Sequence, residues 1–498
     1  MRKPGLSPLL LLAGLAACAS SPGYHESGVA VPAAFRETTP DTAAAARAAA
    51  APTAAPDTVV PSVVEANRPA VDPHAYWRAL GDTTLDRLLV ELLQGNLDVH
   101  AALARLRGAR AARTEAQLDF VPTITVAGGV TRQKLSSATF PIAAGQFPDQ
   151  SIWDAGFDAS WELDLFGRIR KNVQGQGALI GAANEDLRDV QVVLTAELAR
   201  TYFELRGAQE RLAVAQRNGE NQRRTLEVTQ QRLDAGRGTA FDAERARTQL
   251  GFTLASIPSL EAQVTAAQYA IGTLIGRPPA QVAAELTAGE AIPVLPANVA
   301  VASPDSLVRQ RPDVASAERQ VAAGRAFVGA AKAEYLPTIT VGGSAGWTAL
   351  ALDAFDEPGT FRYAVGPVVS WPALNLGRVK ARVDQSQAQA DEAQARYEQT
   401  VLRALQEVET GLSRYRTARV RVERIRDAAA ASARAADLAR LRFEGGVSDF
   451  LQVLDAERTQ LDAEDQLAQA HTDAATSYAA LYQALGGAPL EGATPSDQ

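Results

Sequence analysis

The stretch DFVPTITVAGG at residues 119–129 returns as EYLPTITVGG at residues 334–343, about 215 positions later. Other segments keep a similar separation: LFGRI at 165–169 with NLGRV at 375–379, LDAG at 233–236 with FEGG at 443–446, and RTQL at 247–250 with RTQL at 458–461. Self-similarity of this kind predicts a duplicated unit. We assign the first repeat to residues 71–290 and the second to residues 291–488. Each is expected to contain helices, a strand pair, a very long helix, a tight glycine turn and a shorter helix.

The strand pairs are predicted at residues 120–166 and 335–373, where apolar and polar side chains alternate. Segments of about ten residues with one apolar face, bounded by aromatics, are typical of transmembrane β-barrels. The alternative is a half-buried sheet in a soluble domain. Four strands cannot close a barrel, and open sheet edges are not tolerated in lipid. A membrane-spanning sheet would therefore require several copies of the chain.

Two helices of unusual length are predicted next to the strands. Residues 378–442 contain no proline and one glycine, Gly411, and their apolar residues recur at heptad-like steps. A helix of this size extends about 100 Å. The chain is expected to return through shorter helices at 240–276 and 450–485, the first kinked or interrupted at Pro258. The simplest alternative is a coiled-coil spacer.

The N-terminus has the pattern of an export signal. Arg2 and Lys3 precede an apolar run at 9–17, which predicts a signal peptide over residues 1–17. The sequence LAAC at 15–18 resembles a bacterial lipobox, in which Cys18 carries the lipid (palmitate-type acyl chains). A plain secretory signal is the alternative. Residues 18–70 are rich in Ala, Pro, Thr and Ser, which predicts a tether, and residues 489–498 form a C-terminal tail.

Composition excludes several functions. The 498 residues include one cysteine and four histidines without metal-ligand spacing, so we expect no disulfide, metal or cofactor. The formal charge of −8 disfavours nucleic acid as a partner. Asp158, Glu162 and Asp164 could be mistaken for an acid–base set, but they follow one strand without a Ser/His or metal constellation. We therefore predict that the chain is not an enzyme.

Taken together, these features resemble the outer membrane efflux proteins of the TolC/OprM type, closest to their lipoprotein (NodT-like) branch. The motifs that carry the resemblance are WELDLFGR at 161–168, LIGRPP at 274–279, RPDV at 311–314 and GVSDFLQVLDA at 446–456. The resemblance implies a mixed α and β membrane protein. Three chains would close a trimeric 12-stranded transmembrane β-barrel, four strands each, continued by a long periplasmic α-helical barrel.

The resemblance also implies roles for particular residues. A periplasmic gate is expected at the tips of the two helical hairpins, formed by Asp449, Asp455, Ser448, Gln452, Asp234 and Phe443. Phe443 has no hydroxyl to bond Asp234, so we expect a different latch, through Arg237, Arg232 or Glu444. For each aspartate the alternative is an ordinary solvated carboxylate at a helix start.

Two further groups of residues follow from the resemblance. The turns at Gly236, Arg237, Gly446 and Val447 are expected to contact an adaptor, although a tight turn alone also explains the glycines. Asp154, Asp158, Glu162 and Asp164 are expected to line the lumen, whereas aromatic side chains on the opposite face meet lipid; these are Trp153, Phe157, Trp161, Tyr363 and Trp371.

The function that we expect is a passive exit duct of a tripartite drug or small-molecule efflux system. Its partners would be two further copies, outer-membrane lipid, a periplasmic membrane-fusion adaptor and an inner-membrane pump of the resistance-nodulation-division type. The duct would be lipid-anchored in the bacterial outer membrane and extend into the periplasm. Two alternatives remain open: the exit duct of a type I protein secretion system, and a lipid-anchored periplasmic coiled-coil scaffold.

Overall fold

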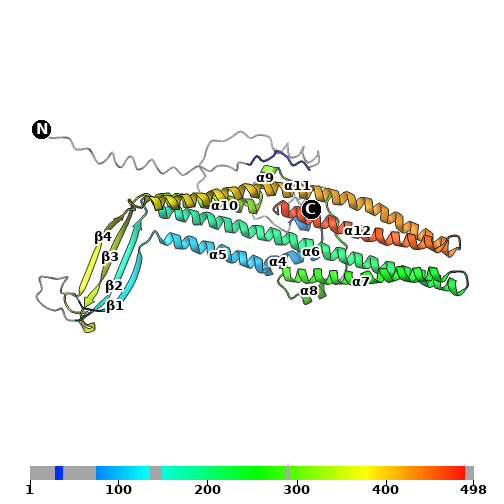
Figure 1. Cartoon of the computed structure of the whole chain (residues 1–498), viewed down its shortest axis with the longest axis horizontal. Helices are drawn as coiled ribbons and strands as arrows, with labels where there is room; N and C mark the ends of the chain where they lie inside the picture. The colour runs from blue at the N-terminus through cyan, green and yellow to red at the C-terminus, as the bar shows by residue number, and fades with distance from the viewer. Residues whose placement is uncertain are drawn as a thin grey trace, which may run out of the picture. The chain divides into compact units, whose positions relative to one another are not determined.

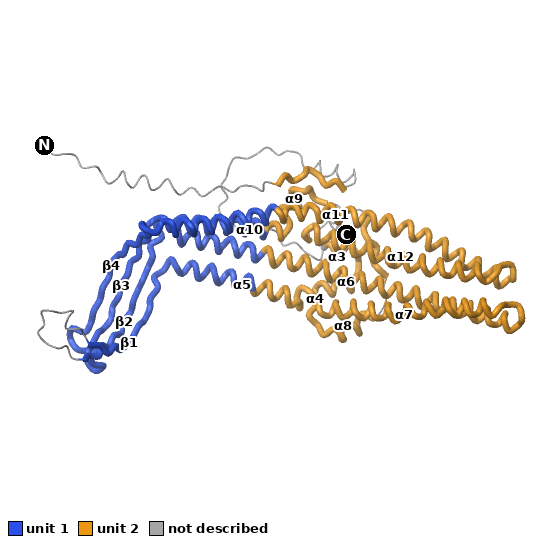
Figure 2. The backbone as a smooth tube through the Cα atoms, viewed as in Figure 1, with its two compact units in different colours: residues 1–28, 105–184, 316–398 blue, residues 29–104, 185–315, 399–498 orange. Residues whose placement is uncertain are grey.

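The computed structural model describes residues 29–37, 75–134, 149–287, 289, 291–297, 299 and 301–487. Cys18, the predicted signal peptide and the C-terminal tail lie outside these residues. The chain divides into two compact units, shown in Figure 2. The described residues of unit 1 lie in Arg105–Asn184 and Ser316–Glu398, and those of unit 2 lie in Val29–Ala104, Glu185–Ala315 and Gln399–Gln498. Each unit therefore takes residues from both halves of the repeat.

Unit 1 contains one antiparallel sheet with the strand order β1-β2-β3-β4 (Figure 1). The strands are β1 (Thr123–Gln133), β2 (Gln150–Leu163), β3 (Thr338–Ala349) and β4 (Phe361–Ser370), with a short 3-10 helix, η3 (Leu352–Ala354), before β4. They lie inside the two predicted strand pairs. Consecutive strands pair along their length, as at Phe157 opposite Ala345. In the described part of the chain, the outer edges of β1 and β4 have no strand partner.

The helices that belong in part to unit 1 are α5 (Leu97–Leu118), α6 (Arg168–Asp234), α10 (Pro312–Ala333) and α11 (Leu376–Glu444). Small residues allow them to pack closely in this unit. A Cβ added at Gly175 would lie 2.5 Å from the ring of Phe327, and one at Gly324 would lie 3.2 Å from the backbone of Ala390. These positions explain why the helices are rich in glycine and alanine.

Unit 2 is helical. It contains α3 (Ala75–Arg78), α4 (Thr83–Gly95), α7 (Ala240–Leu274), α8 (Pro279–Glu285), α9 (Pro304–Gln310) and α12 (Phe450–Ala484), with parts of α5, α6, α10 and α11. Two helical hairpins, α6–α7 and α11–α12, dominate it (Figure 1). Nowhere in the described ranges is a helix both long and apolar enough to cross a membrane.

The heptad-like seams of the long helices face the core of unit 2. Val401, Val408 and Tyr415 of α11 are buried, as are Leu198 and Tyr202 of α6. Burial of such large side chains contributes about 1.5–3 kcal/mol each, so these seams position both hairpins.

The prediction that Pro258 would interrupt the return helix is wrong. It lies inside α7, which runs without a break from Ala240 to Leu274. Pro258 is on the exposed side of the helix. A carbonyl left without its helical donor there can hydrogen-bond to water, which lowers the cost of the proline.

One described segment lies within the predicted tether and differs from that expectation. Residues 29–37 belong to unit 2, and Phe35 is only 4% exposed in its apolar core. An aromatic side chain provides the apolar area that the surrounding Ala, Pro, Thr and Ser residues do not.

Candidate functional site at the hairpin tips

The two hairpins end in turns of the same kind. Gly236 and Gly446 have φ values of 69° and 72°, a conformation that favours glycine. The backbone N–H of each glycine donates to the carbonyl oxygen three residues back. The N–H of the next residue donates to the carbonyl oxygen five residues back, from Arg237 to Arg232 at 2.8 Å and from Val447 to Arg442 at 2.9 Å. This is the Schellman pattern that ends a helix. The glycines at the tips are therefore explained by backbone geometry.

Arg232 joins one hairpin tip to the other. Its Nη1 donates to the carbonyl oxygen of Phe443 at 2.6 Å, and its guanidinium lies 4.3 Å from the centre of the Phe443 ring. The Phe443 ring also packs against Phe450 in a small apolar cluster. An arginine thus connects α6 to the end of α11 without a hydroxyl on residue 443.

The predicted gate carboxylates differ in their surroundings. Asp449 is the N-cap of α12, because its Oδ1 accepts from the backbone N–H of Gln452 at 3.2 Å. Asp234 accepts from Gln230 of its own helix at 3.1 Å. Asp455 is exposed and has no ion-pair partner among the described residues. The structure thus gives Asp449 a structural role and leaves Asp455 with a free carboxylate.

The other predicted tip residues are placed as follows. Gln452 and Arg237 are exposed, and Val447 is 72% exposed. Ser448 is partly buried, and its hydroxyl oxygen has no hydrogen-bond partner in the described structure. One turn therefore presents a charged side chain next to its glycine and the other an apolar one.

A polar contact behind the tips was not predicted from the sequence. Glu457 of α12 is 2% exposed, yet its Oε1 accepts from the Thr225 hydroxyl of α6 at 2.7 Å and from Arg440 Nε of α11 at 2.9 Å. Arg440 also donates to Gln460 at 3.1 Å. The available signal was that two polar residues, Asn218 and Thr225, recur seven positions apart and so share one side of the long helix.

A second charged cluster lies where α9 meets α10. Arg311, whose side chain is 6% exposed, binds Asp313 with two nitrogens, at 3.0 and 2.7 Å, and also Glu407 of α11 at 2.7 Å. Its remaining Nη1 donates to the carbonyl of Ala484 at 2.7 Å. Burial, and secondarily the negative charge of Asp313, raise the pKa of Asp189 on α6 to about 6.

The first repeat has a neutral counterpart of this cluster. Asn96 occupies the position of Arg311, and its Nδ2 donates to the carbonyl of Leu274 at 2.7 Å, just as Arg311 donates to Ala484. The duplicated halves therefore use the same backbone contact with a different side chain.

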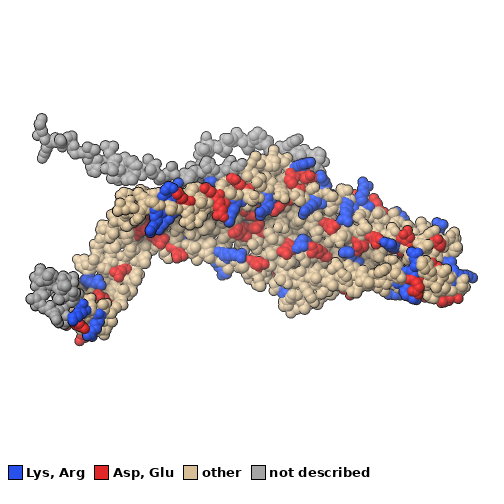
Figure 3. Space-filling view, viewed as in Figure 1, with Lys and Arg blue, Asp and Glu red and all other residues tan. Residues whose placement is uncertain are grey.

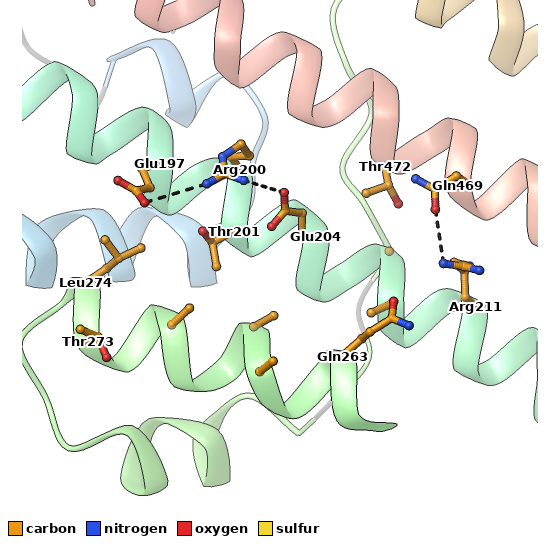
Figure 4. A pocket seen from close by; sticks show the side chains of 15 residues that line it. Glu197, Arg200, Thr201, Glu204, Arg211, Gln263, Thr273, Leu274, Gln469 and Thr472 are labelled. Atoms are coloured by element: carbon orange, nitrogen blue, oxygen red, sulfur yellow. Dashed lines mark hydrogen bonds and ion pairs between the residues drawn. The ribbon is translucent and has the colours of Figure 1, made fainter. Parts of the chain in front are cut away.

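A groove of about 720 Å³ lies between α6, α7 and α12 (Figure 4). Arg200 on one wall contacts Glu204 at 2.8 Å, and Arg211 contacts Asp465 at 2.7 Å and Gln469 at 3.4 Å. Three alanines, Ala266, Ala267 and Ala270, lie on the α7 side. Because both arginines are already paired, the groove offers no unpaired cation to an anionic ligand.

In unit 1, the predicted lumen carboxylates have different environments. Asp154 accepts from the Thr348 hydroxyl at 2.6 Å and pairs with Arg362 at 3.4 Å, which joins β2, β3 and β4. Glu162 accepts two hydrogen bonds from the Arg168 guanidinium, at 2.9 and 2.8 Å. Asp158 is an exposed residue of β2.

Asp164 lies beyond the last residue of β2. Its two oxygens accept from the backbone N–H groups of Ile169 and Arg170, at 3.0 and 2.9 Å. It therefore holds the start of α6, a role that explains its position better than a strand face.

The opposite face of the sheet is apolar and exposed. Val126, Tyr363 and Val365 are each more than 70% exposed. Trp161 and Trp371 donate their indole N–H groups to the carbonyls of Phe120 and Tyr335, at 2.8 and 3.0 Å, at corresponding places of the two repeats. Figure 3 shows fewer charged side chains over the strands than over the helices in that view.

Comparison with known proteins identifies the class. The sequence model of the outer membrane efflux protein family matches residues 88–277 and 304–487. The chain belongs to this family, whose members are channels of the outer membrane and not enzymes. No group of three or more possible metal ligands occurs within the described ranges.

Individual relatives cover most of the chain. Nodulation protein T of Rhizobium leguminosarum bv. trifolii is 28% identical over 420 residues, which is 83% of this chain and 87% of that protein. Outer membrane protein OprJ of Pseudomonas aeruginosa is 29% identical over 499 residues, 99% and 98% of the two chains. The solved outer-membrane channel OprN is 38% identical, with a TM-score of 0.77 over 87% of this chain and 99% of that one. The Neisseria gonorrhoeae MtrE channel is 25% identical, with a TM-score of 0.79 over 95% and 99%.

Proposed function

We propose that the chain is the outer-membrane exit duct of a tripartite drug or small-molecule efflux system. Three copies form a passive pore, anchored by lipid at Cys18 and gated at its periplasmic end. The pore receives its cargo from a resistance-nodulation-division pump through a periplasmic membrane-fusion adaptor. The family to which the chain belongs supports the general role.

The observation that carries the proposal is the sheet of unit 1. Its apolar face is exposed and its edge strands lack partners in the described structure. On β2, Trp153 and Trp161 are eight residues apart, or about 27 Å along the strand, close to the apolar band of about 25 Å of outer-membrane barrels. Unpaired edges cost several kcal/mol per polar group in lipid. Three copies in a ring would pair every edge and give twelve strands.

The tips of the hairpins are proposed to form the gate. Asp455 has the free, exposed carboxylate that a ring of three copies would bring together. A ring of negative charges around a narrow opening attracts cations and repels anions. The Arg232–Phe443 contact would hold the two tips of each copy together in the closed pore. Gly236, Arg237, Gly446 and Val447 would provide the adaptor-contacting turns.

The names of relatives favour small molecules as cargo. One relative, 29% identical over 95% of this chain, is a pyoverdine export outer membrane protein of Pseudomonas aeruginosa. Another, 27% identical over 84%, belongs to a toluene efflux pump of Pseudomonas putida. These names favour small-molecule efflux over type I protein secretion. A periplasmic coiled-coil scaffold would leave the exposed apolar face of the sheet unexplained.

The experiment uses purified full-length protein in planar lipid bilayers. We expect Asp455→Asn to raise single-channel conductance and to abolish block by a trivalent cation such as hexamminecobalt. Asp449→Ser removes the second charge but keeps an N-cap side chain for α12. The control is Asp427→Asn, an exposed position on α11. Unchanged conductance and block in the Asp455 variant would refute the gate, and the lack of any channel would refute the duct.

A further inference from the structure

Residues 29–37 make a set of specific contacts with α11. The carboxylate of Glu409 accepts from two successive backbone N–H groups, those of Arg36 at 2.7 Å and Glu37 at 3.1 Å. The Glu37 carboxylate pairs with Arg416 at 2.6 Å. Glu409 and Arg416 are seven residues apart, so they lie on the same side of the helix.

The side chain of Phe35 completes the attachment. It is 4% exposed and belongs to the same apolar cluster as Val408 and Tyr415 of α11. Val408 comes directly before Glu409 in the sequence, and Tyr415 comes directly before Arg416. The stretch of α11 that binds residues 36 and 37 therefore also contributes to the apolar core in which the Phe35 ring is buried.

This mode of contact is that of a bound peptide. A carboxylate that accepts from consecutive backbone N–H groups makes charge-assisted hydrogen bonds, which are about twice as strong as neutral ones. A buried aromatic anchor beside them supplies the apolar area. Both features fix one register of the segment on the helix.

We propose that residues 29–37 form an intramolecular strap that docks on α11 at Glu409 and Arg416 and so fixes the N-terminal anchor to unit 2. The link to an anchor rests on the proposed acylation of Cys18. A displacement of the lipid anchor would then act directly on α11, through the docked residues 29–37.

The strap changes the length of chain that is free between the lipid and the protein. From Cys18 to Phe35 an extended chain reaches at most about 60 Å. From Cys18 to Ala75, the start of α3, it reaches about 200 Å. Docking therefore shortens the chain that is free between the lipid and unit 2 about threefold.

Chymotrypsin cleavage after Phe35 in the full-length protein tests the strap. A docked Phe35 is protected, because its side chain is buried and the next two N–H groups are bonded. We expect Glu409→Gln to accelerate this cleavage at least tenfold at an unchanged melting temperature of the helices. Glu423→Gln, at an exposed position of the same helix, is the matched control and should leave the rate unchanged.

A charge exchange separates the specific contact from a general loosening. Arg416→Glu should accelerate cleavage, and Glu37→Arg in the same chain should restore it to within twofold of the original rate. Cleavage of the unaltered protein as fast as the Glu409 variant would overturn the proposal. Failure of the double variant to restore protection would also overturn the assigned pairing.

Radioactive palmitate distinguishes the strap from the anchor. Both proteins carry Tyr24→Ser for this experiment, so that Phe35 is the first chymotrypsin site after Cys18. In labelled membranes treated briefly with chymotrypsin, the label should stay with the rest of the chain when Glu409 is present and should be separated from it, on a short peptide, in the Glu409 variant. Absence of label in both would refute acylation of Cys18 in the proposed function, while the cleavage rates would still decide whether the strap docks.

Discussion

Asp189 provides the most quantitative prediction, because it is a partly buried carboxylate in a cluster that already contains two others. Arg311 is fully occupied by Asp313, Glu407 and the carbonyl of Ala484. A charge on Asp189 therefore adds repulsion to the cost of burial. We expect Asp189→Asn to stabilise unit 2 at neutral pH, since the amide keeps the shape of the carboxyl group without its charge.

The magnitude follows from the pKa. Burial and Asp313 raise the pKa of Asp189 from 3.8 to about 6. One unit corresponds to about 1.36 kcal/mol, so ionising Asp189 costs the folded state at most about 3 kcal/mol. The pKa of Asp189 is higher in the folded than in the unfolded protein, so protonation of Asp189 stabilises the folded state, and this stabilisation is complete below pH 4. It is lost as the pH rises through 6.

The assay is the thermal unfolding of full-length protein in detergent, followed by circular dichroism between pH 4.5 and 8. The quantity to compare is the melting temperature of the Asp189→Asn variant minus that of the unaltered protein. This difference should rise with pH and level off above pH 7. Asp462→Asn, at an exposed position, is the control. A difference that is independent of pH would refute the reasoning.

Three further perturbations test other contacts. Glu457→Ala should lower the free energy of unfolding by about 2–4 kcal/mol, because Arg440 loses its buried acceptor; urea denaturation measures this. Gly207→Val should cost about 3 kcal/mol, because a Cβ there would lie 1.9 Å from the Thr472 hydroxyl oxygen; the readout is the same urea midpoint. Trp371→Phe should cost about 1 kcal/mol through the lost indole hydrogen bond, seen as a lower melting temperature of the sheet by infrared spectroscopy.

The glycine substitution has a matched control, and two of these predictions have a contradicting result. Gly251→Ala should be tolerated, since nothing lies within 4 Å of the added Cβ. Equal midpoints for Gly207→Val and Gly251→Ala would contradict the close packing of α6 on α12. Arg440 also donates to Asp437 at 2.7 Å. A loss below about 0.5 kcal/mol for Glu457→Ala would show that Arg440 relies on Asp437 and Gln460 instead.

Much of the fold could be predicted from the sequence because its signals are periodic. The internal repeat located both strand pairs, and the long apolar seam predicted α11 within a few residues of its observed bounds, Leu376–Glu444. Glycine at the tips predicted the turns, since only glycine readily adopts positive φ. Each of these signals is local or repeats along the chain.

The remaining features depend on contacts that the sequence does not encode locally. Phe35 resembles an isolated aromatic residue in a polar tether, and only the folded core of unit 2 buries it. Asp164 looks like one more carboxylate on a strand, and only the end of β2 one residue earlier makes it a helix anchor. Pro258 is tolerated because its side of α7 is exposed, which periodicity alone did not reveal.

The two tip turns share a backbone and differ in side chains, and this has a consequence for stoichiometry. In the proposed assembly of three chains, the rim would carry six turns of one backbone shape, with Arg237 and Val447 alternating around it. A partner that binds only the backbone N–H and carbonyl groups would find six equivalent sites. A partner that binds the neighbouring side chain would find three equivalent sites of each kind. The number of partner molecules bound per rim therefore reports which of the two surfaces is recognised.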